Sequence, residues 1–167
     1  SHDRTLLDEC ADHILAINRS EIQVLSPVKK GPLGVEYLNR FLQASLNPPA
    51  PGKKEISVGN DVFREEDKVM HIRNNYDLEW TMRTPGGFVY EEGKGVFNGD
   101  IGVIKKINPH SRLLEVRFDD GKYVIYDFVL LEELVLAYAT TIHKAQGSEY
   151  PAVVIPLLSG PELLMNR

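Results

Sequence analysis

T-T-I-H-K-A-Q-G-S-E, residues 140–149, is the stretch that decides the fold of this chain. It follows an apolar run, residues 134–139, that has the length of a buried strand, and it precedes a second apolar run, residues 152–158. The predicted order is therefore strand, polar turn or short helix, strand. In an open α/β sheet, ligands collect in the loops that follow the carboxyl ends of strands, so these polar residues lie where a site is expected. The alternative, on composition alone, is a solvated loop between two strands.

Length and composition limit the class of protein. The 167 residues suit one domain or one and a half, and a hydrophobic fraction of 43% is enough for a core. No run approaches ~18 apolar residues, and the first residues carry no apolar secretory segment, so a soluble protein without a membrane partner is expected. The single cysteine, Cys10, excludes an internal disulfide and fits the reducing cytoplasm. The net charge of −5 argues against nonspecific polyanion binding, so any contact with nucleic acid must be local.

The amino-terminal part predicts helix, strand and helix. Apolar spacing indicates an amphipathic helix over about residues 4–17, with Cys10 buried and inert on its apolar side. A short strand is expected over residues 22–25, ended by Pro27, and a second helix from Val35 to Asn47. The loop between them contains Lys29 and Lys30, which are either solvated or in contact with a DNA backbone.

The middle of the chain changes to an all-β pattern. Residues 48–54, rich in proline and basic residues, indicate a linker. Strands are expected over residues 68–72, 101–104, 114–118 and 123–126, with turns at Asn98-Gly99 and at Asp120-Gly121. Several short strands in succession predict a small barrel, because an isolated hairpin would be marginal. Both ends return to the α/β pattern, so the barrel is interpreted as an insertion.

Residues 77–95 predict a hairpin extension of that barrel. Its aromatic residues Trp80, Phe88 and Tyr90 either stack on unpaired bases or hold the hairpin together by cross-strand packing, which is the favoured interpretation. The glycine-rich residues 87–95 do not form a phosphate-binding loop. Five residues rather than four separate Gly87 from Gly93, and no serine or threonine follows Lys94.

Three ordered blocks of sequence resemble the RecD-like superfamily 1 DNA helicases, of the RecD/TraA or exodeoxyribonuclease V alpha subunit type. V-L-S-P-V-K-K-G-P-L-G-V-E-Y-L-N, residues 24–39, is similar to a segment of their second RecA-like domain. D-K-V-M-H-I-R-N-N-Y-D, residues 67–77, and V-F-N-G-D-I-G-V-I, residues 96–104, resemble the lead into their Src-homology-3-like barrel. T-T-I-H-K-A-Q-G-S-E resembles their fifth core motif, which lies between DNA and ATP.

The resemblance implies an α/β fold, namely part of a RecA-like, P-loop-type helicase domain with an inserted small all-β Src-homology-3-like barrel. Residues 1–60 are then expected to be the first part of the second RecA-like domain, and residues 61–137 the barrel. Residues 138–167 are expected to be the remainder of that domain, truncated before its terminal motif.

The resemblance also implies the roles of the motif residues by position. The residues expected to bind DNA are Thr141, His143 and Lys144; a hydroxyl and an imidazole suit that task because phosphate oxygens accept hydrogen bonds. Lys144 and Gln146 lie between the two groups of residues, and either ligand remains open for them. The residues expected to face the nucleotide are Gln146, Gly147 and Glu149. The glycine lets backbone approach a phosphate, and the glutamate accepts from a ribose hydroxyl.

The function implied is that of the C-terminal portion of an ATP-dependent 5′ to 3′ DNA helicase for repair or recombination. The full-length parent is expected to use ATP and Mg²⁺, and its partners to be single-stranded DNA and the missing N-terminal RecA-like domain. Whether it acts alone or with other subunits of a recombination nuclease stays open. No G-x-x-x-x-G-K-[ST] loop and no acidic pair after an apolar strand occur in the sequence. The chain alone is therefore expected to have no catalytic residue, metal site or cofactor, and to be inactive as an ATPase.

Two other classes of protein remain open from the sequence. A non-enzymatic adaptor would use the barrel to bind a protein or peptide, with exposed aromatic residues for which the candidates are Tyr123, Tyr126 and Phe128. A nuclease or a different nucleotide-binding enzyme is disfavoured, because no carboxylate cluster, metal-ligand spacing or catalytic triad pattern is present.

Overall fold

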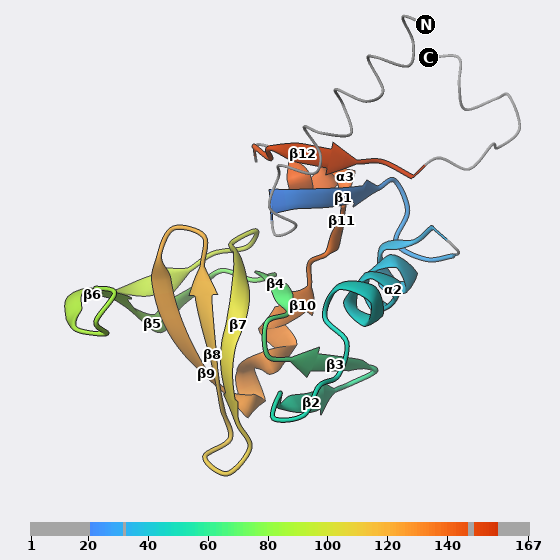
Figure 1. Ribbon diagram of the computed structural model, residues 1–167. Helices are drawn as coiled ribbons and strands as arrows, with labels where there is room; N and C mark the ends of the chain where they lie inside the picture. The colour runs from blue at the N-terminus through green and yellow to red at the C-terminus, as the bar shows by residue number, and fades with distance from the viewer. Residues whose placement is uncertain (1–20, 32, 147–148, 157–167) are drawn as a thin grey trace, which may run out of the picture. The chain divides into compact units, whose positions relative to one another are not determined.

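The computed structural model describes residues 21–31, 33–146 and 149–156, and most of the described elements are strands (Figure 1). The chain divides into two compact units, Ser1–Leu38 with Ala139–Arg167, and Asn39–Tyr138. The first boundary therefore lies ahead of the proline-rich residues 48–54, where the sequence placed a linker. The helix expected over residues 4–17, with Cys10, lies outside the described residues.

The first unit contains a three-stranded parallel sheet in the order β11-β1-β12. Its strands are β1 (Ile22–Ser26), β11 (Ala139–Thr141) and β12 (Ala152–Val154). Because β1 and β11 are parallel, their carboxyl ends lie at the same edge of the sheet. The strand expected over residues 22–25 is confirmed. In the described part of the second apolar run, residues 152–156, three residues form a strand, and two of them, Val153 and Val154, are exposed.

Helix α2 (Val35–Leu46) confirms the second predicted helix, which ends ahead of Pro48 and Pro49. Its buried face is only partly apolar. Leu38 is buried, but Phe41 is 57% exposed. The helix and the residue after it bury polar side chains instead, namely Asn39, Gln43 and Asn47.

A fully buried carboxylate, Asp67, accounts for two of these buried polar side chains. It accepts hydrogen bonds from Gln43 Nε2 at 2.6 Å, Asn47 Nδ2 at 2.7 Å, the Arg64 backbone N–H at 2.7 Å and the Tyr138 hydroxyl at 2.8 Å. A buried charge is costly without such donors. Burial still raises the pKa of Asp67, although its hydrogen bonds act in the opposite direction. We call Asp67 and these four donors the Asp67 cluster.

The second unit is built on a seven-stranded antiparallel sheet in the order β10-β4-β7-β8-β9-β5-β6. Its strands are β4 (Lys68–His71), β5 (Asn75–Arg83), β6 (Val89–Val96), β7 (Ile101–Asn108), β8 (Leu113–Phe118), β9 (Lys122–Asp127) and β10 (Leu134–Leu136). The four expected strands and both expected turns are confirmed. A 3₁₀ helix, η2 (Phe128–Glu133), joins β9 to β10. The core lies inside this sheet and includes the fully buried residues Val69, Ile104, Leu114, Val116 and Tyr126.

A two-stranded antiparallel hairpin precedes the sheet and was not expected. It consists of β2 (Glu55–Val58) and β3 (Asp61–Arg64). The signal was available in Gly59-Asn60, because Gly59 has a φ of 60° and so supplies the left-handed conformation that a tight turn requires.

The prediction of one continuous strand over residues 134–139 is wrong. Leu134–Leu136 is β10, which pairs antiparallel with β4, whereas Ala139–Thr141 is β11, which pairs parallel with β1. The two strands belong to different units, and the backbone N–H of Ala137 between them donates to Lys68 O at 2.8 Å. Both halves of the run are buried. The apolar pattern therefore continues across the boundary and does not show where one strand ends and the next begins.

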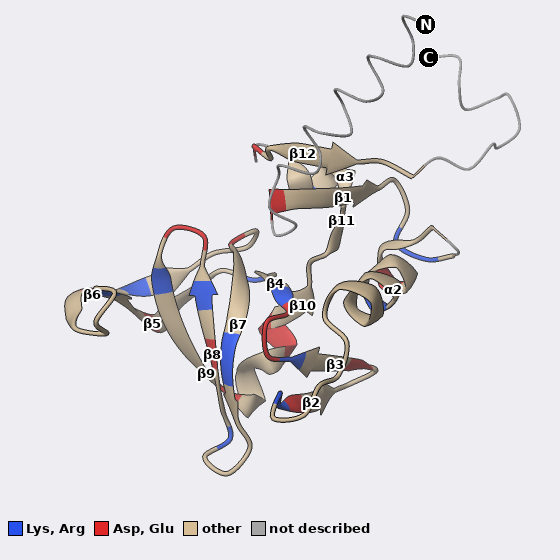
Figure 2. Cartoon of the chain, viewed as in Figure 1, with Lys and Arg blue, Asp and Glu red and all other residues tan. Residues whose placement is uncertain are grey.

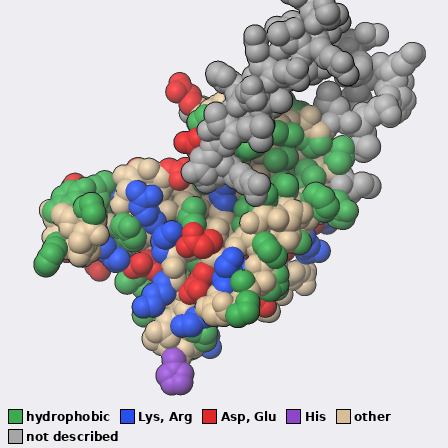
Figure 3. Space-filling view, in the orientation of Figure 1, with side chains coloured by type: hydrophobic (Ala, Val, Ile, Leu, Met, Phe, Trp, Pro, Cys, Tyr) green, Lys and Arg blue, Asp and Glu red, His purple; other side chains and the backbone are tan. Residues whose placement is uncertain are grey.

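The β5–β6 hairpin confirms the predicted extension, and its free end projects to the left of β7 to β9 in Figure 1. Cross-strand packing holds for Trp80, which is paired with Gly93. A Cβ on that glycine would lie 2.4 Å from the Trp80 ring. Packing does not cover the other two aromatic residues, since Phe88 is 78% and Tyr90 is 65% exposed. Hydrophobic side chains are accordingly visible at the hairpin's free end in Figure 3.

Candidate nucleic-acid interface

The candidate site lies at the carboxyl edge of the parallel sheet in the first unit. Ser26, the last residue of β1, is paired with Thr141, the last residue of β11. The loop that leaves β1 and the short helix that leaves β11 therefore begin side by side. This is the part of an α/β sheet where ligands are usually bound.

The loop after β1 is held in one shape by Ser26 and Gly34. The buried Ser26 hydroxyl donates to Leu33 O at 2.6 Å and accepts from the Val28 N–H at 3.2 Å. A Cβ on Gly34 would lie 2.4 Å from the carbonyl carbon of Lys30, so only glycine allows the loop to close. Sequence reasoning did not single out Ser26, although a serine directly before Pro27 at a strand end is typical of such a turn.

The loop also satisfies the start of helix α2. Val35 and Glu36 donate their backbone N–H groups to Val28 O and Lys29 O, at 3.1 and 3.3 Å. Two backbone N–H groups of the first helical turn are thus hydrogen-bonded to the loop. The exposed side chains of the loop include Lys29 and Lys30 beside Pro27 and Val28.

The segment after β11 forms a single helical turn, α3 (Ile142–Ala145). Thr141 is its N-cap: its backbone is extended, and its Oγ1 accepts from the Lys144 N–H at 3.3 Å. Ala145 is buried, whereas the side chains of His143 and Lys144 are exposed. All three residues expected to bind DNA, Thr141, His143 and Lys144, therefore lie together at the sheet edge.

Three lysine side chains follow this edge of the sheet. No carboxylate lies within 4.0 Å of the ammonium groups of Lys29, Lys30 or Lys144 in the described part of the chain. The pKa of Lys144 is lowered, first by desolvation and second by the like charge of Lys29. The basic loop after β1 is seen between β1 and α2 in Figure 2.

The residues expected to face the nucleotide are less closely grouped. Gln146 caps the carboxyl end of α3 and is exposed, so it lies beside the DNA-binding candidates. Gly147 lies outside the described residues. Glu149 is exposed and leads into β12, whose first residue, Ala152, is paired with Ile22 at the opposite end of β1. The geometry thus sets Glu149 apart from the edge that carries Thr141.

Neither a metal site nor a membrane span is found in the described ranges. Within residues 21–31, 33–146 and 149–156, no group of three His, Cys, Asp or Glu side chains is placed to hold a metal ion. No helix in these ranges has the length and apolar character needed to cross a membrane.

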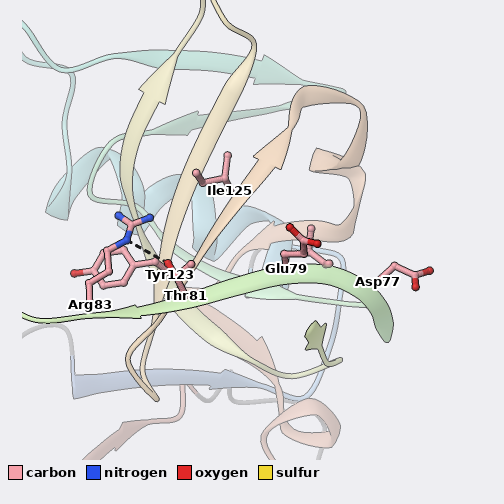
Figure 4. A pocket seen from close by; sticks show the side chains of 7 residues that line it. Asp77, Glu79, Thr81, Arg83, Tyr123 and Ile125 are labelled. Carbon is pink, nitrogen blue, oxygen red and sulfur yellow. Dashed lines mark hydrogen bonds between the residues drawn. The ribbon is translucent and has the colours of Figure 1, made fainter. Parts of the chain in front are cut away.

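The aromatic residues that an adaptor would need are not presented as an exposed cluster. Tyr126 is fully buried and Phe128 packs against the core. Tyr123 lies under the guanidinium group of Arg83, 4.5 Å from its ring centroid. A cavity of about 360 Å³ beside Tyr123 has mixed walls, with two carboxylates at one end and Arg83 at the other (Figure 4). Its lining residues are Asp77, Leu78, Glu79, Thr81, Arg83, Tyr123 and Ile125.

Comparison with known families finds two ranges of the chain that match helicase domain models. Residues 38–118 match the SH3 domain of ATP-dependent RecD-like DNA helicases, and residues 136–167, which include the candidate site, match the UvrD-like helicase C-terminal domain. The expected resemblance is confirmed in these two ranges, one of which matches a RecD-like SH3 domain and the other a UvrD-like C-terminal domain.

Individual proteins are also similar to this chain. The ATP-dependent RecD2 DNA helicase of Deinococcus radiodurans is 35% identical over 133 residues, which is 80% of this chain and 16% of that protein. An uncharacterized protein of Methanocaldococcus jannaschii is 33% identical over 91% of this chain and 14% of its own length. A solved structure of two Pif1 helicases at forked double-stranded DNA has a TM-score of 0.50 and 18% identity, covering 81% of this chain and 32% of that one. The chain thus spans less than a fifth of the two curated relatives.

Proposed function

We propose that this chain is the C-terminal portion of an ATP-dependent DNA helicase that moves 5′ to 3′ in repair or recombination. In this proposal the parallel sheet is part of the second RecA-like domain, and its carboxyl edge binds the backbone of single-stranded DNA. The 35% identity to a RecD2 DNA helicase supports the proposal, as does the match of residues 136–167 to a helicase C-terminal domain.

The observation that carries the proposal is the placement of Thr141, His143 and Lys144 on one turn at the end of β11. Phosphate oxygens accept hydrogen bonds, and all three side chains are donors. The Thr141 oxygen accepts from Lys144 N–H, which leaves its hydroxyl proton available to a phosphate. His143 and Lys144 are exposed, so a backbone can reach them without rearrangement of the sheet.

Fewer residues of this chain are proposed to contact the nucleotide. The exposed carboxylate of Glu149 can accept a hydrogen bond from a ribose hydroxyl. The exposed amide of Gln146 lies next to the residues proposed to bind DNA. Gly147 is assigned to the same side by its place in the motif. Nothing in the sequence fits the triphosphate or Mg²⁺, so these are proposed to bind chiefly to an N-terminal RecA-like domain of the whole protein. ATP supplies the free energy for movement when bound.

The whole protein is proposed to act in the cytoplasm, alone or with other subunits of a recombination nuclease. For the chain itself we expect no ATP hydrolysis, since it lacks a phosphate-binding loop. A steady-state ATPase assay with single-stranded DNA tests this. Turnover that survives further purification would contradict it.

DNA binding is tested by fluorescence anisotropy with a labelled oligothymidylate at low salt, because phosphate contacts weaken steeply as salt rises. The chain is expected to bind, and His143→Ala to bind several-fold more weakly. His110→Ala is the matched control, since His110 is an exposed histidine on the turn between β7 and β8 in the other unit. Absence of binding by the unmodified chain, or equal losses in the two variants, overturns the proposal.

The same substitution separates DNA binding from chemistry in the full-length parent. There His143→Ala is expected to lower DNA-stimulated ATP turnover more than unstimulated turnover. Equal losses would mean that His143 does not act through DNA.

A further inference from the structure

The loop between β1 and α2 carries a lysine that the proposed function does not use. We propose that Lys29 of this loop and Lys144 of α3 bind one and the same phosphate group of single-stranded DNA. The inference rests on the proposed function and extends it. It makes the DNA site a two-sided one, built from segments more than a hundred residues apart in sequence.

The backbone geometry brings the two lysines to one edge. Ser26 and Thr141 are paired in register, and each is the last residue of its strand. Lys29 follows Ser26 by three residues, and Lys144 follows Thr141 by three. Both segments are held by local bonds at these two anchors, the first through the Ser26 hydroxyl and the second through the Thr141 N-cap.

The lysines at this edge form no close ion pair among the described residues. Three lysines of the other unit provide a contrast. Lys94, Lys105 and Lys122 each contact a carboxylate, with N–O distances of 3.0, 3.2 and 2.7 Å. Lys29 and Lys144 have no carboxylate within 4.0 Å in the described ranges, and the pKa of Lys144 is lowered chiefly by desolvation and further by the charge on Lys29. Two neighbouring cations repel, and an anion bound between them relieves that repulsion.

A phosphodiester suits this arrangement. It carries one negative charge and two unesterified oxygens, so two ammonium groups from opposite sides can each approach one oxygen. The donors of Thr141 and His143 lie on the same turn as Lys144, which continues the contact along the backbone. Bases need not be contacted, so binding through this pair is expected to be independent of sequence.

The salt dependence of binding tests whether the two lysines share a phosphate. For single strands, the slope of log K against log salt decreases in magnitude by about 0.7 for each phosphate that the protein no longer neutralises. The slope is measured by anisotropy for the unmodified chain, Lys29→Ala, Lys144→Ala and the double variant. Lys30→Ala is the matched control, because it removes the same charge from the adjacent exposed position.

Each single substitution of Lys29 or Lys144 is expected to weaken binding, and the slope of the double variant to decrease by only about 0.7 in total. Lys30→Ala is expected to leave the slope unchanged. A decrease of about 1.4 in the double variant, or equal effects of Lys29→Ala and Lys30→Ala, overturns the shared phosphate. Circular dichroism confirms folding, which these exposed lysines are not expected to affect.

Two further arms separate the possible failures. If the unmodified chain does not bind DNA, the proposed function fails and this inference fails with it. If Lys144→Ala and His143→Ala weaken binding but Lys29→Ala does not, only the inference fails. ATP added at matched ionic strength is expected not to displace the DNA. Displacement that disappears in Lys29→Ala would assign the lysine to a nucleotide phosphate and overturn the inference.

Discussion

The hydroxyl group of Tyr138 donates a 2.8 Å hydrogen bond to Oδ1 of Asp67, across 71 residues of sequence. Tyr138 is the last residue of the second unit, directly ahead of β11. Asp67 also accepts hydrogen bonds from the side chains of Gln43 and Asn47, which lie near the start of that unit. One buried carboxylate thus holds both ends of the unit together.

Tyr138→Phe is expected to lower the free energy of unfolding by about 1.5–3 kcal/mol, since it removes one donor from a buried charge while the ring remains. Urea denaturation measures this. Tyr76→Phe is the matched control, because Tyr76 is 68% exposed, and it is expected to change stability by less than about 0.5 kcal/mol. Equal effects at the two positions would show that the Asp67 cluster does not depend on the Tyr138 hydroxyl.

His71 predicts a loss of stability in mild acid. The imidazole is fully buried, its Nδ1 is hydrogen-bonded to the Tyr126 hydroxyl at 3.0 Å, and its Nε2 lies 3.7 Å from Glu133 Oε2. Burial lowers the pKa of His71 below its ordinary 6.5, although Glu133 and Asp100 act in the opposite direction. The unfolded chain therefore binds this proton more readily than the folded chain. The free energy of unfolding should decrease as pH falls from 6.5 toward the lower pKa of the folded state.

Urea denaturation between about pH 7.5 and about pH 5.5 measures this dependence. The slope should be smaller in His71→Gln than in the unmodified chain, and His110→Gln, which replaces an exposed histidine, is the control variant. NMR titration of the imidazole signals gives a second readout that does not require a variant. A His71 ring that titrates at or above its ordinary pKa would contradict the expectation.

The contact between Trp80 and Gly93 predicts a spectroscopic change. Gly93→Ala would place a Cβ 2.4 Å from Cζ2 of Trp80, so the ring must move off the hairpin. We expect a loss of about 1–3 kcal/mol and a shift of the emission of this single tryptophan to longer wavelength. Gly86→Ala is the control, since its Cβ would lie 3.5 Å from the nearest atom. An unchanged emission spectrum in Gly93→Ala would contradict the prediction.

Gly34 predicts that DNA binding depends on loop shape as well as charge. Gly34→Ala would bring a Cβ to 2.4 Å from the Lys30 carbonyl carbon, so residues 29–30 must shift. Binding to oligothymidylate should weaken although no charge is removed, and stability should fall by about 1–3 kcal/mol. Anisotropy and urea denaturation are measured together, at a temperature where the variant is folded. Unchanged affinity in Gly34→Ala would show that the loop position is irrelevant to binding.

Local signals predicted much of the second unit. Asp120-Gly121 marked the turn between β8 and β9, and Asn98-Gly99 the turn ahead of β7, because both pairs favour the backbone angles of tight turns. Helix α2 followed from its apolar spacing and the prolines after Asn47. Those features depend on neighbours in sequence, so a pattern is enough to find them.

The remaining features depend on contacts between distant residues. The division between Leu136 and Ala139 is set by which sheet each strand joins, and both strands are equally apolar. Asn39, Gln43 and Asn47 have the pattern of a solvated face, yet they are buried, two of them around a carboxylate some twenty residues later. At the candidate site, the motif located Thr141, His143 and Lys144. The approach of Lys29 to them follows only from the pairing of β1 with β11.

The Asp67 cluster also bears on how such a chain can be assembled from parts. Because one side chain binds both the entry and the exit of residues 39–138, those two points lie close together. A unit with adjacent ends can be placed within another domain, or removed from it, with little disturbance to the host strands. The second unit thus has the geometry expected of an inserted domain. Its own buried carboxylate, Asp67, holds its first and last segments close together.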